Sequence, residues 1–324
     1  MKVIIPVAGT GTRLKPHTLT LPKPLLRMGG KAILDYLLRP ITELGPEEVV
    51  FVVGYKGDMI RDYVRKNYAF ESRFIQQDRL LGLGYAIHVA LEGLTDSPLM
   101  ILLGDTIIEG DLGKFVRAGD YTLGLHQVDD PQRFGIAEVV DGSITRVVEK
   151  PKRPKGNLAL IGLYYLSESG RIRDKLARLV RLGKKTRGEI QLTDALAAMI
   201  KDGVQFTPFE VSKWFDCGKK ETMLATSRHF LVNAPAPDEI PGSTLLPPVH
   251  IGENARIENS VIGPDVSVGA GTRVKNSVIS DAIIGNDVRI ENLVIEKSII
   301  GNNVVLRGDK KVLNIGDSTQ ITGC

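Results

Sequence analysis

An aliphatic residue recurs every five or six positions through the C-terminal part of this 324-residue chain. Glycine directly follows several of these residues, as in Ile262-Gly263 and Ile284-Gly285. Such a period is typical of a parallel β-helix, in which each short strand points one aliphatic side chain inward and stacked coils share a core. Irregular surface loops would not keep this register over the eleven positions of the repeat, which are Ile251, Ile257, Ile262, Val268, Val274, Ile279, Ile284, Ile290, Ile295, Ile300 and Leu306. We therefore predict a short left-handed parallel β-helix of about four coils over residues 249–324.

The first 232 residues follow a different pattern, in which short apolar runs alternate with longer amphipathic stretches. Strands that alternate with helices indicate an α/β fold with a parallel sheet covered on both faces. The expected strands are 3–7, 49–53 and 99–103, and the expected helices are 32–44, 59–66 and 85–94. After this region come three prolines within residues 233–242, which cannot sustain a regular element. The sequence predicts an α/β domain over 1–232, a linker over 233–248 and the β-helix over 249–324.

Composition narrows the class of partner. The net charge is +4 and no block of five like charges occurs, which argues against binding to nucleic acid. The N-terminal apolar run is too short for a signal peptide or a membrane span. The two cysteines, Cys217 and Cys324, have no metal-ligand or disulfide spacing, which favours a reducing compartment. We expect a cytoplasmic protein that binds neither nucleic acid nor membrane.

A glycine-rich segment follows the first expected strand. It reads Pro6-Val7-Ala8-Gly9-Thr10-Gly11-Thr12-Arg13-Leu14. Glycines let backbone N–H groups approach phosphate oxygens, so a loop of this kind can bind an anion. The segment lacks the third glycine of the dinucleotide fingerprint and the Gly-Lys-Ser/Thr ending of a P-loop. By itself, a tight structural turn would explain it about as well.

A second basic residue, Lys23, follows Arg13 ten positions later in the sequence. A glycine-rich loop with Gly-Thr-Arg, followed by Lys-Pro about ten residues later, resembles the signature of sugar nucleotidyltransferases of the glucose-1-phosphate thymidylyltransferase and uridylyltransferase group. The resemblance implies a Rossmann-like, mostly parallel sheet, and it implies that Arg13 and Lys23 neutralise the triphosphate and the departing pyrophosphate. Ala8 stands where many members have glycine, which looks more like the uridylyltransferase branch. The nucleotide-binding residues implied in this loop are Ala8, Gly9, Gly11 and Thr12.

Gln77 and Gly82 resemble the part of this family that reads the pyrimidine edge. A glutamine amide offers both a donor and an acceptor, as uracil and thymine require. A surface glutamine beside a glycine that starts a helix is the structural alternative. The pattern favours a pyrimidine nucleotide without separating dTTP from UTP, because burial of the thymine methyl group contributes only about 1 kcal/mol.

Two aspartates complete the nucleotide half of the resemblance. They occur in Leu102-Leu103-Gly104-Asp105 and in Trp214-Phe215-Asp216-Cys217-Gly218. The resemblance places Asp105 and Asp216 on one magnesium ion, which prefers one or two carboxylates with phosphate oxygens and water. Taken singly, an aspartate that ends a strand is more often a turn or helix cap. A nucleophilic role for Cys217 has no support, because no histidine lies near it in sequence.

The sugar half of the resemblance consists of short motifs around Gly135, Glu149-Lys150 and Gly162. It implies that Gly135 brings backbone close to a sugar hydroxyl, that Glu149 accepts hydrogen bonds from hydroxyls, and that Lys150 holds the sugar phosphate as a point charge. Gly162 belongs to the next substrate-lining strand in this reading. A solvated ion pair and a plain core strand are the alternatives. Phe134 stands where the family often has tyrosine, which puts one hydrogen bond in doubt.

The segment Gly188-Glu189-Ile190-Gln191-Leu192-Thr193-Asp194 is close to a hallmark of the family. Thr193 and Asp194 are of the types that open a helix, and this is the interpretation that we favour for Thr193. Glu189 is a candidate for contact with the sugar, with a structural role as the alternative.

These motifs imply transfer of a nucleotidyl group from dTTP or UTP to a sugar 1-phosphate, by default glucose 1-phosphate, with Mg²⁺ as cofactor. A regulatory subunit that binds sugar nucleotides without catalysis would lack some of the charged residues of the motifs. All of them are present in this sequence: Arg13, Lys23, Asp105, Lys150 and Asp216. A second, acyltransferase activity on the β-helix needs a basic residue between coils, and only His250 falls near the repeat. A dinucleotide-binding oxidoreductase is not favoured, because the glycine-rich loop lacks the third glycine of the dinucleotide fingerprint. We expect the β-helix to serve assembly into a homo-oligomer, or regulation.

Overall fold

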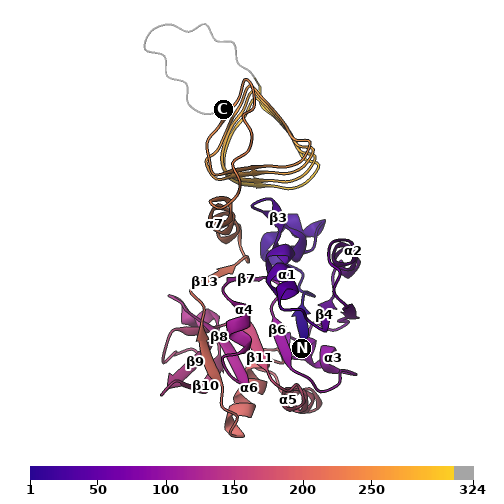
Figure 1. Ribbon diagram of the computed structural model, residues 1–324, viewed down its shortest axis with the longest axis vertical. Coiled ribbons are helices and arrows are strands. Elements are labelled where there is room, and N and C mark those ends of the chain that lie inside the picture. Colours follow the sequence, from indigo (N-terminus) through magenta and orange to yellow (C-terminus); the bar gives the residue numbers. More distant parts are fainter. Residues whose placement is uncertain (310–324) are drawn as a thin grey trace. The chain divides into compact units, whose positions relative to one another are not determined.

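The computed structural model describes residues 1–309, which divide into two units (Figure 1). The first unit comprises Met1–Leu26 and Lys31–Met223, and the second comprises Arg27–Gly30 together with the chain from Leu224 onward. Arg27–Gly30 thus belong to the unit of the C-terminal part, although they lie early in the sequence. Cys324 and the end of the predicted 249–324 segment lie outside the described residues.

A nine-stranded sheet forms the centre of the first unit. Strands β5, β4, β1 and β6 run parallel in this order, and antiparallel β11 continues the sheet beside β6. The apolar run of β1 is unbroken because residues 3–5 are fully buried in the middle of the sheet. The strands are β1 (Lys2–Pro6), β4 (Glu48–Val53), β5 (Ser72–Gln76), β6 (Leu99–Leu102), β8 (Tyr121–Gln127), β9 (Gly135–Val140), β10 (Ser143–Glu149), β11 (Leu158–Leu166) and β12 (Thr207–Glu210). The predicted α/β class with a Rossmann-like sheet is confirmed.

Amphipathic helices accompany this sheet. In α1, the residues buried at three- and four-residue spacing are Ile33, Leu34, Leu37, Leu38 and Ile41, as expected for a helix with one apolar face. The helices are α1 (Ile33–Glu43), α2 (Gly57–Asn67), α3 (Leu83–Leu91), α4 (Leu112–Val116), α5 (Gly170–Arg181) and α6 (Leu192–Lys201). The first three overlap the helices predicted from the sequence. Within residues 1–309, no helix is both long and apolar enough to cross a lipid bilayer.

Short strands near the predicted site lie outside the main sheet. β7 (Thr106–Glu109) pairs antiparallel with β13 (Lys213–Asp216), so that Asp216 lies opposite Thr106. β2 (Arg27–Met28) and β3 (Lys31–Ala32) are the arms of a hairpin whose tip is Gly29-Gly30. The hairpin directly follows the 3₁₀ turn η3 (Lys23–Leu25). The chain therefore passes from a predicted catalytic lysine straight into this hairpin.

The second unit is built from short parallel strands that stack into coils. In one row, Ile257, Val274, Ile290 and Leu306 lie in register on β16, β19, β21 and β23. The predicted inward positions from Ile257 to Ile290 are buried, because each coil covers the next. The elements are α7 (Lys220–Leu231), β14 (Thr244–Leu245), β15 (Val249–Ile251), β16 (Arg256–Glu258), β17 (Val261–Ile262), β18 (Val266–Val268), β19 (Arg273–Lys275), β20 (Val278–Ile284), β21 (Arg289–Glu291), β22 (Val294–Ile300) and β23 (Val305–Arg307). The predicted parallel β-helix is confirmed, and residues 232–243 before it form neither helix nor strand.

Asparagines mark one corner of successive coils. Asn259, Asn276 and Asn292 have positive φ angles of 46°, 49° and 58°, a conformation that asparagine tolerates better than most residues. Asn259 Nδ2 donates to Asn276 Oδ1 at 2.8 Å, and Asn276 Nδ2 donates to Asn292 Oδ1 at 3.1 Å. A ladder of side-chain amides therefore joins the coils in addition to the backbone hydrogen bonds.

Candidate active site

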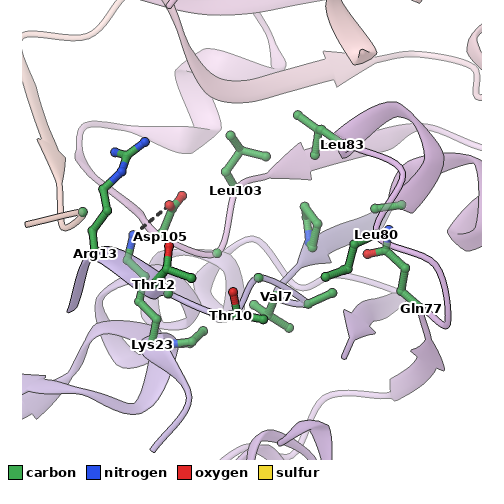
Figure 2. Close-up of a pocket in the computed structure, with 18 of the residues that line it drawn as sticks. Val7, Thr10, Thr12, Arg13, Lys23, Gln77, Leu80, Leu83, Leu103 and Asp105 are labelled. Atoms are coloured by element: carbon green, nitrogen blue, oxygen red, sulfur yellow. Dashed lines mark hydrogen bonds and ion pairs between the residues drawn. The ribbon is translucent and has the colours of Figure 1, made fainter. Parts of the chain in front are cut away.

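A cavity of ≈570 Å³ lies in the first unit beyond the ends of β1 and β6 (Figure 2). The carboxyl ends of parallel strands are the usual place for ligand binding in open α/β sheets. The residues predicted from the sequence that line this cavity are Ala8, Gly9, Gly11, Thr12, Arg13, Lys23, Gln77, Gly82, Asp105 and Asp216. Those that do not line it are Gly135, Glu149, Lys150 and Gly162. The structure thus gathers the residues predicted to bind the nucleotide and the metal around one cavity, and those predicted to bind the sugar phosphate do not line it.

The glycine-rich loop forms one wall of the cavity. Gly11 has a φ of 63°, and a Cβ atom there would lie 2.8 Å from Thr18 Cγ2, so the loop itself requires glycine at this position. The Thr18 hydroxyl donates to the Gly11 carbonyl oxygen at 3.0 Å and fixes the turn. At Gly9, by contrast, a Cβ atom would meet no atom within 4 Å. Packing therefore does not explain Gly9, whereas close approach of a ligand to the backbone would.

Lys23 and Asp105 form an ion pair in the cavity. Lys23 Nζ lies 2.8 Å from Asp105 Oδ2, and the two side chains are 11% and 48% exposed (Figure 2). The pair brings together η3 and the end of β6, which are 82 residues apart. A charge-assisted hydrogen bond of this kind orients the ammonium group. Arg13, on the turn η1 (Thr12–Leu14), lines the same cavity. Two cations and a carboxylate therefore face the space where phosphates would lie.

Asp216 adds a second carboxylate to the same end of the cavity. It ends β13 opposite Thr106, the residue that follows Asp105. A Cβ atom at Gly218 would lie 2.8 Å from Asp216 Oδ1, so glycine lets the backbone pass close to this carboxylate. Cys217 between them is fully buried, and its backbone N–H donates to the Asp105 carbonyl oxygen at 3.4 Å. The carboxylates of Asp105 and Asp216 are thus carried on neighbouring segments.

The donor set near Asp105 fits magnesium. Within residues 1–309, no group of three or more His, Cys, Asp or Glu side chains could hold a metal ion. Mg²⁺ is usually bound by one or two carboxylates and completes its octahedron with phosphate oxygens and water. Asp105 and Asp216 supply two carboxylates at a cavity large enough for phosphates. These two residues are the ones that would hold the ion.

Gln77 and Gly82 lie at the other end of the cavity. The Gln77 side chain is buried, and its Nε2 donates to the Arg79 carbonyl oxygen at 3.1 Å. Gly82 precedes α3 with a φ of 109°, and a Cβ atom there would lie 2.7 Å from Glu189 Cβ. Gly82 is therefore needed for the close approach of the segment that carries Glu189. The burial of Gln77 argues against the alternative that it is an ordinary surface glutamine.

The lining residues that were not predicted as nucleotide contacts include Leu80, Leu83 and Leu103 (Figure 2). Leu80 is 60% exposed despite its apolar side chain, and it faces the same space as Gln77. A planar base could pack its face against the exposed Leu80 side chain and direct its polar edge toward the Gln77 amide. A sequence signal existed, because Leu80 lies between Gln77 and Gly82, but an isolated leucine is usually a core residue.

Glu149 and its neighbours form a second polar group. Gly135 lies opposite Glu149 in the β9–β10 pair, and a Cβ atom there would lie 3.2 Å from Glu149 Oε2. Thr193 Oγ1 donates to the same oxygen at 2.7 Å, and Lys150 Nζ lies 3.2 Å from Glu149 Oε1. Burial, with the negative charge of Glu149 as a further cause, raises the pKa of the Tyr164 hydroxyl. The polar residues of the sugar motif thus lie together around one carboxylate.

Thr193 differs from its expected role. It lies in the first turn of α6, as predicted, but the N-cap is Gln191 and has no side-chain cap bond. The Thr193 hydroxyl instead donates to Glu149. Glu189, four residues earlier, lines the cavity. The segment from Glu189 to Thr193 therefore joins the cavity to the group around Glu149.

Gly162 has a structural reason to be glycine. Its φ is 84°, and a Cβ atom would lie 2.5 Å from Leu103 Cγ. The Leu103 N–H donates to the Gly162 carbonyl oxygen at 2.9 Å. Gly162 thus supports a residue that lines the cavity, and its predicted contact with the sugar phosphate stays a prediction.

Aromatic residues join two of the sequence motifs. The Phe134 and Trp214 rings meet edge to face, with centroids 5.3 Å apart. The Trp214 Nε1–H is buried and has no hydrogen-bond partner within the described part of the chain. Burial of an unpaired donor is costly. The packing of Phe134 against Trp214 therefore leaves the indole N–H without a protein acceptor among the described residues.

Comparison with known proteins shows the family of this chain. The sequence profile of the family described as nucleotidyl transferase matches residues 2–232. The chain belongs to the nucleotidyl transferase family. It is 35% identical over 238 residues to the low-salt glycan biosynthesis nucleotidyltransferase Agl11 of Haloferax volcanii, covering 70% of this chain and 65% of that protein. It is 31% identical over 276 residues to glucose-1-phosphate thymidylyltransferase of Streptomyces antibioticus, covering 80% of this chain and 75% of that protein.

The fold is similar to that of UDP-glucose pyrophosphorylase complexed with UDP-glucose. The TM-score is 0.62 at 25% sequence identity, and the match covers 71% of this chain and 97% of the other. The chain spans less than two thirds of the length of the Haloferax relative.

Proposed function

We propose that this protein transfers a nucleotidyl group from a pyrimidine nucleoside triphosphate to a sugar 1-phosphate and releases pyrophosphate. The observation that carries the proposal is the Lys23–Asp105 pair in a cavity that Asp216 and the glycine loop also line. A metal-binding carboxylate pair and two cations around one cavity suit a triphosphate substrate. Membership of the nucleotidyl transferase family supports the same reaction class.

The reaction requires little covalent help from the protein. A sugar phosphate oxygen is already an anionic nucleophile, so it needs only to be held in line with the α-phosphorus. Negative charge then builds on the departing pyrophosphate, where Arg13 and Lys23 stabilise it. Lys150 holds the attacking phosphate, and Glu149, oriented by Thr193, accepts hydrogen bonds from sugar hydroxyls. No enzyme-linked intermediate is needed.

Asp105 and Asp216 would hold magnesium in this scheme. When bound, the ion supplies charge neutralisation and alignment of the phosphate oxygens. The Lys23 ammonium group lies 2.8 Å from Asp105 Oδ2, so one carboxylate of the pair has a cation beside it before any ligand binds. The protein thus contributes two fixed negative charges within a cationic cavity.

Gln77, beside the exposed Leu80, supports a pyrimidine base. Both uracil and thymine match an amide donor and acceptor. One relative is named a thymidylyltransferase and one solved structure a UDP-glucose pyrophosphorylase. Both dTTP and UTP are therefore proposed nucleotides, and glucose 1-phosphate is the proposed sugar phosphate.

The test is pyrophosphate release from glucose 1-phosphate, Mg²⁺ and each of dTTP, UTP, GTP and ATP in separate reactions. We expect release with dTTP or UTP that Asp105→Asn abolishes. If glucose 1-phosphate gives no release, other sugar 1-phosphates are tested next. Absence of release with every pair would overturn the proposal and favour a sugar-nucleotide-binding regulatory subunit.

We also propose a homo-oligomer assembled through the β-helix. Val278 and Val294 lie in register on β20 and β22 and are 43% and 80% exposed. Exposed valines on a flat strand row suit contact with another copy. Light scattering of the wild type and of Val278→Lys/Val294→Lys tests this, and a monomeric wild type would refute it.

A further inference from the structure

Positive charge is concentrated in one short segment of the first unit. Residues 146–155, which end β10 and continue into the following loop, carry five Lys or Arg residues and one acidic residue. Their net charge of +4 equals the net charge of the whole 324-residue chain, so all other residues are neutral as a group. Lys150 belongs to the proposed sugar-phosphate group, but the other cations have no role in the proposed reaction. A surface with this charge attracts anions.

Three of these cations line a small groove. Arg146 comes from β10, and Arg153 and Lys155 come from the loop after it. The apolar part of the lining consists of Ile136, Val148 and Pro151. The volume of the groove is ≈60 Å³. This is several times the space that one water requires and far below the roughly 300 Å³ of the smallest sites for drug-sized ligands, so one oxyanion fits and a nucleoside does not.

The groove lies on the face of the β9–β10 pair that is opposite to Glu149. Arg146 and Val148 line the groove and are two residues apart on β10, where the register with β9 is regular. Because successive side chains of a strand point to opposite faces, Glu149 lies on the other face, where Thr193 donates to it. The groove is therefore separate from the polar group around Glu149.

Two of the three cations lack a counter-ion in the protein. Arg146 Nη1 lies 3.2 Å from Glu138 Oε1, and Glu138 also lines the groove. Arg153 and Lys155 are exposed, and neither forms an ion pair with any residue of the described range 1–309. Like charges that line one small space repel each other, and a bound anion would relieve this repulsion.

The loop between β10 and β11 is held at both ends. At its start, the Lys150 N–H donates to the Phe134 carbonyl oxygen at 3.0 Å. Near its end, the Asn157 carbonyl oxygen accepts from the Val128 N–H at 3.0 Å. Two prolines between these points fix their own φ angles and restrict the residues before them. The cations of the loop are therefore presented from a backbone with few alternative conformations.

Glu138 determines which oxyanion suits the groove. An ionised carboxylate only accepts hydrogen bonds, so it repels an anion that carries no proton. Hydrogen phosphate keeps a proton near neutral pH, and its hydroxyl can donate to Glu138 while its other oxygens accept from Arg153 and Lys155. Sulfate has no proton under these conditions and cannot make the bond to Glu138.

We infer that this groove binds inorganic phosphate. Arg146, Arg153 and Lys155 supply the positive charge. Glu138 accepts a hydrogen bond from the phosphate hydroxyl. The inference goes beyond the proposed reaction and does not depend on it, because phosphate binding requires no turnover.

The experiment titrates the full chain with inorganic phosphate, and separately with sulfate, by isothermal titration calorimetry. Hydrogen exchange of the peptides that cover residues 150–157 locates the bound ion. The test variant is Arg153→Gln/Lys155→Gln. The matched control is Lys184→Gln/Lys185→Gln, which removes the same charge from two exposed lysines of the same unit that do not line the groove. Lys150→Met separates the groove from the sugar-phosphate group, and thermal melting of every variant reports the fold.

We expect phosphate to bind the wild type with a Kd on the order of 1 mM, because exposed charges each contribute little. Bound phosphate should slow exchange within residues 150–157, and sulfate should bind more weakly. Arg153→Gln/Lys155→Gln should weaken phosphate binding about tenfold, whereas the lysine control and Lys150→Met should stay within about twofold of the wild type. Glu138→Gln should reduce the preference for phosphate over sulfate, because it removes the charge that repels sulfate.

Four results would overturn the inference. Absence of phosphate binding to the wild type is the first. Equal losses in the test variant and the lysine control would indicate diffuse attraction to the surface. Loss of binding in Lys150→Met would place the ion in the sugar-phosphate group, and equal affinities for phosphate and sulfate would remove the role of Glu138. If the double variant does not fold, Arg153→Gln and Lys155→Gln are measured singly against the same control.

Discussion

Lys23→Met would remove one positive charge from the cavity while keeping most of the volume of the side chain. Lys23 Nζ lies 2.8 Å from Asp105 Oδ2, and Lys23 is 11% exposed whereas Asp105 is 48% exposed. A preorganised charge aimed at the departing pyrophosphate is worth about 3 kcal/mol, which corresponds to a loss of about 10²-fold in kcat.

Stability should change far less than activity in this variant. Because Asp105 is half exposed, solvent screens the ion pair, and its contribution is at most about 1 kcal/mol. For a unit of this size, that corresponds to a shift of less than about 4 °C in Tm. The loss of kcat therefore cannot be attributed to unfolding at the assay temperature.

The assay is continuous pyrophosphate release at saturating sugar 1-phosphate, with circular dichroism melting of the same samples. Lys15→Met is the control, because Lys15 is exposed, lies in the same segment and does not line the cavity. A kcat within fivefold of the wild type, at an unchanged KM for the nucleotide, would refute the role assigned to Lys23. Equal losses in both variants would refute it as well.

Three further predictions concern single side chains. Asp216→Asn should lower kcat by about 10²-fold and raise the Mg²⁺ concentration for half-maximal rate, measured by Mg²⁺ titration. Thr193→Val should raise the KM for the sugar 1-phosphate about fivefold, because Glu149 loses an orienting donor, whereas Thr193→Ser should restore it. Hydrogen bonds led by the Ser169 hydroxyl hold the pKa of Asp96 below its usual range. Its stabilising contribution is therefore present above the ordinary aspartate pKa and lost as the pH falls through the lowered value. Denaturant melts should accordingly show a smaller acid-side loss of stability in Asp96→Asn than in the wild type.

Local patterns predicted most of the architecture. The aliphatic repeat defined the inward residues of the β-helix because every coil repeats the same geometry, so Val274 and Ile290 needed no knowledge of distant contacts. The apolar runs of β1 and β4 and the helical spacing of α1 are likewise local. At these positions, burial follows from the period alone.

Contacts between distant segments were less accessible. The sequence motifs predicted Lys23 and Asp105 separately, but their ion pair depends on the way η3 and β6 end at one cavity. Gly162 supports Leu103 because β11 lies antiparallel beside β6, and no local signal reveals which strand is its neighbour. Thr193 was interpreted as a helix opener because its partner, Glu149, lies 44 residues away.

The hydrogen bonds of Gly29 and Gly30, at the tip of the β2–β3 hairpin, had no sequence signal. Ser227 and Ser267 are of a type that is usually exposed, and nothing in their surroundings indicates that they accept from Gly29 and Gly30. Such contacts depend on the relation between elements from opposite ends of the chain. Periodicity describes only the elements themselves.

The asparagine ladder restricts the ways in which this chain can change its length over evolution. Successive asparagines are separated by 17 and 16 residues, so one coil is a unit that can be copied or deleted. A duplication of a whole coil would renew the amide at the corner and leave every aliphatic residue facing inward. An insertion inside a strand would shift the following residues and turn aliphatic side chains toward water, whereas a corner absorbs a change of one residue, as the spacings of 17 and 16 show. The β-helix is therefore expected to vary among related chains mainly by whole coils, while the α/β unit keeps its own dimensions.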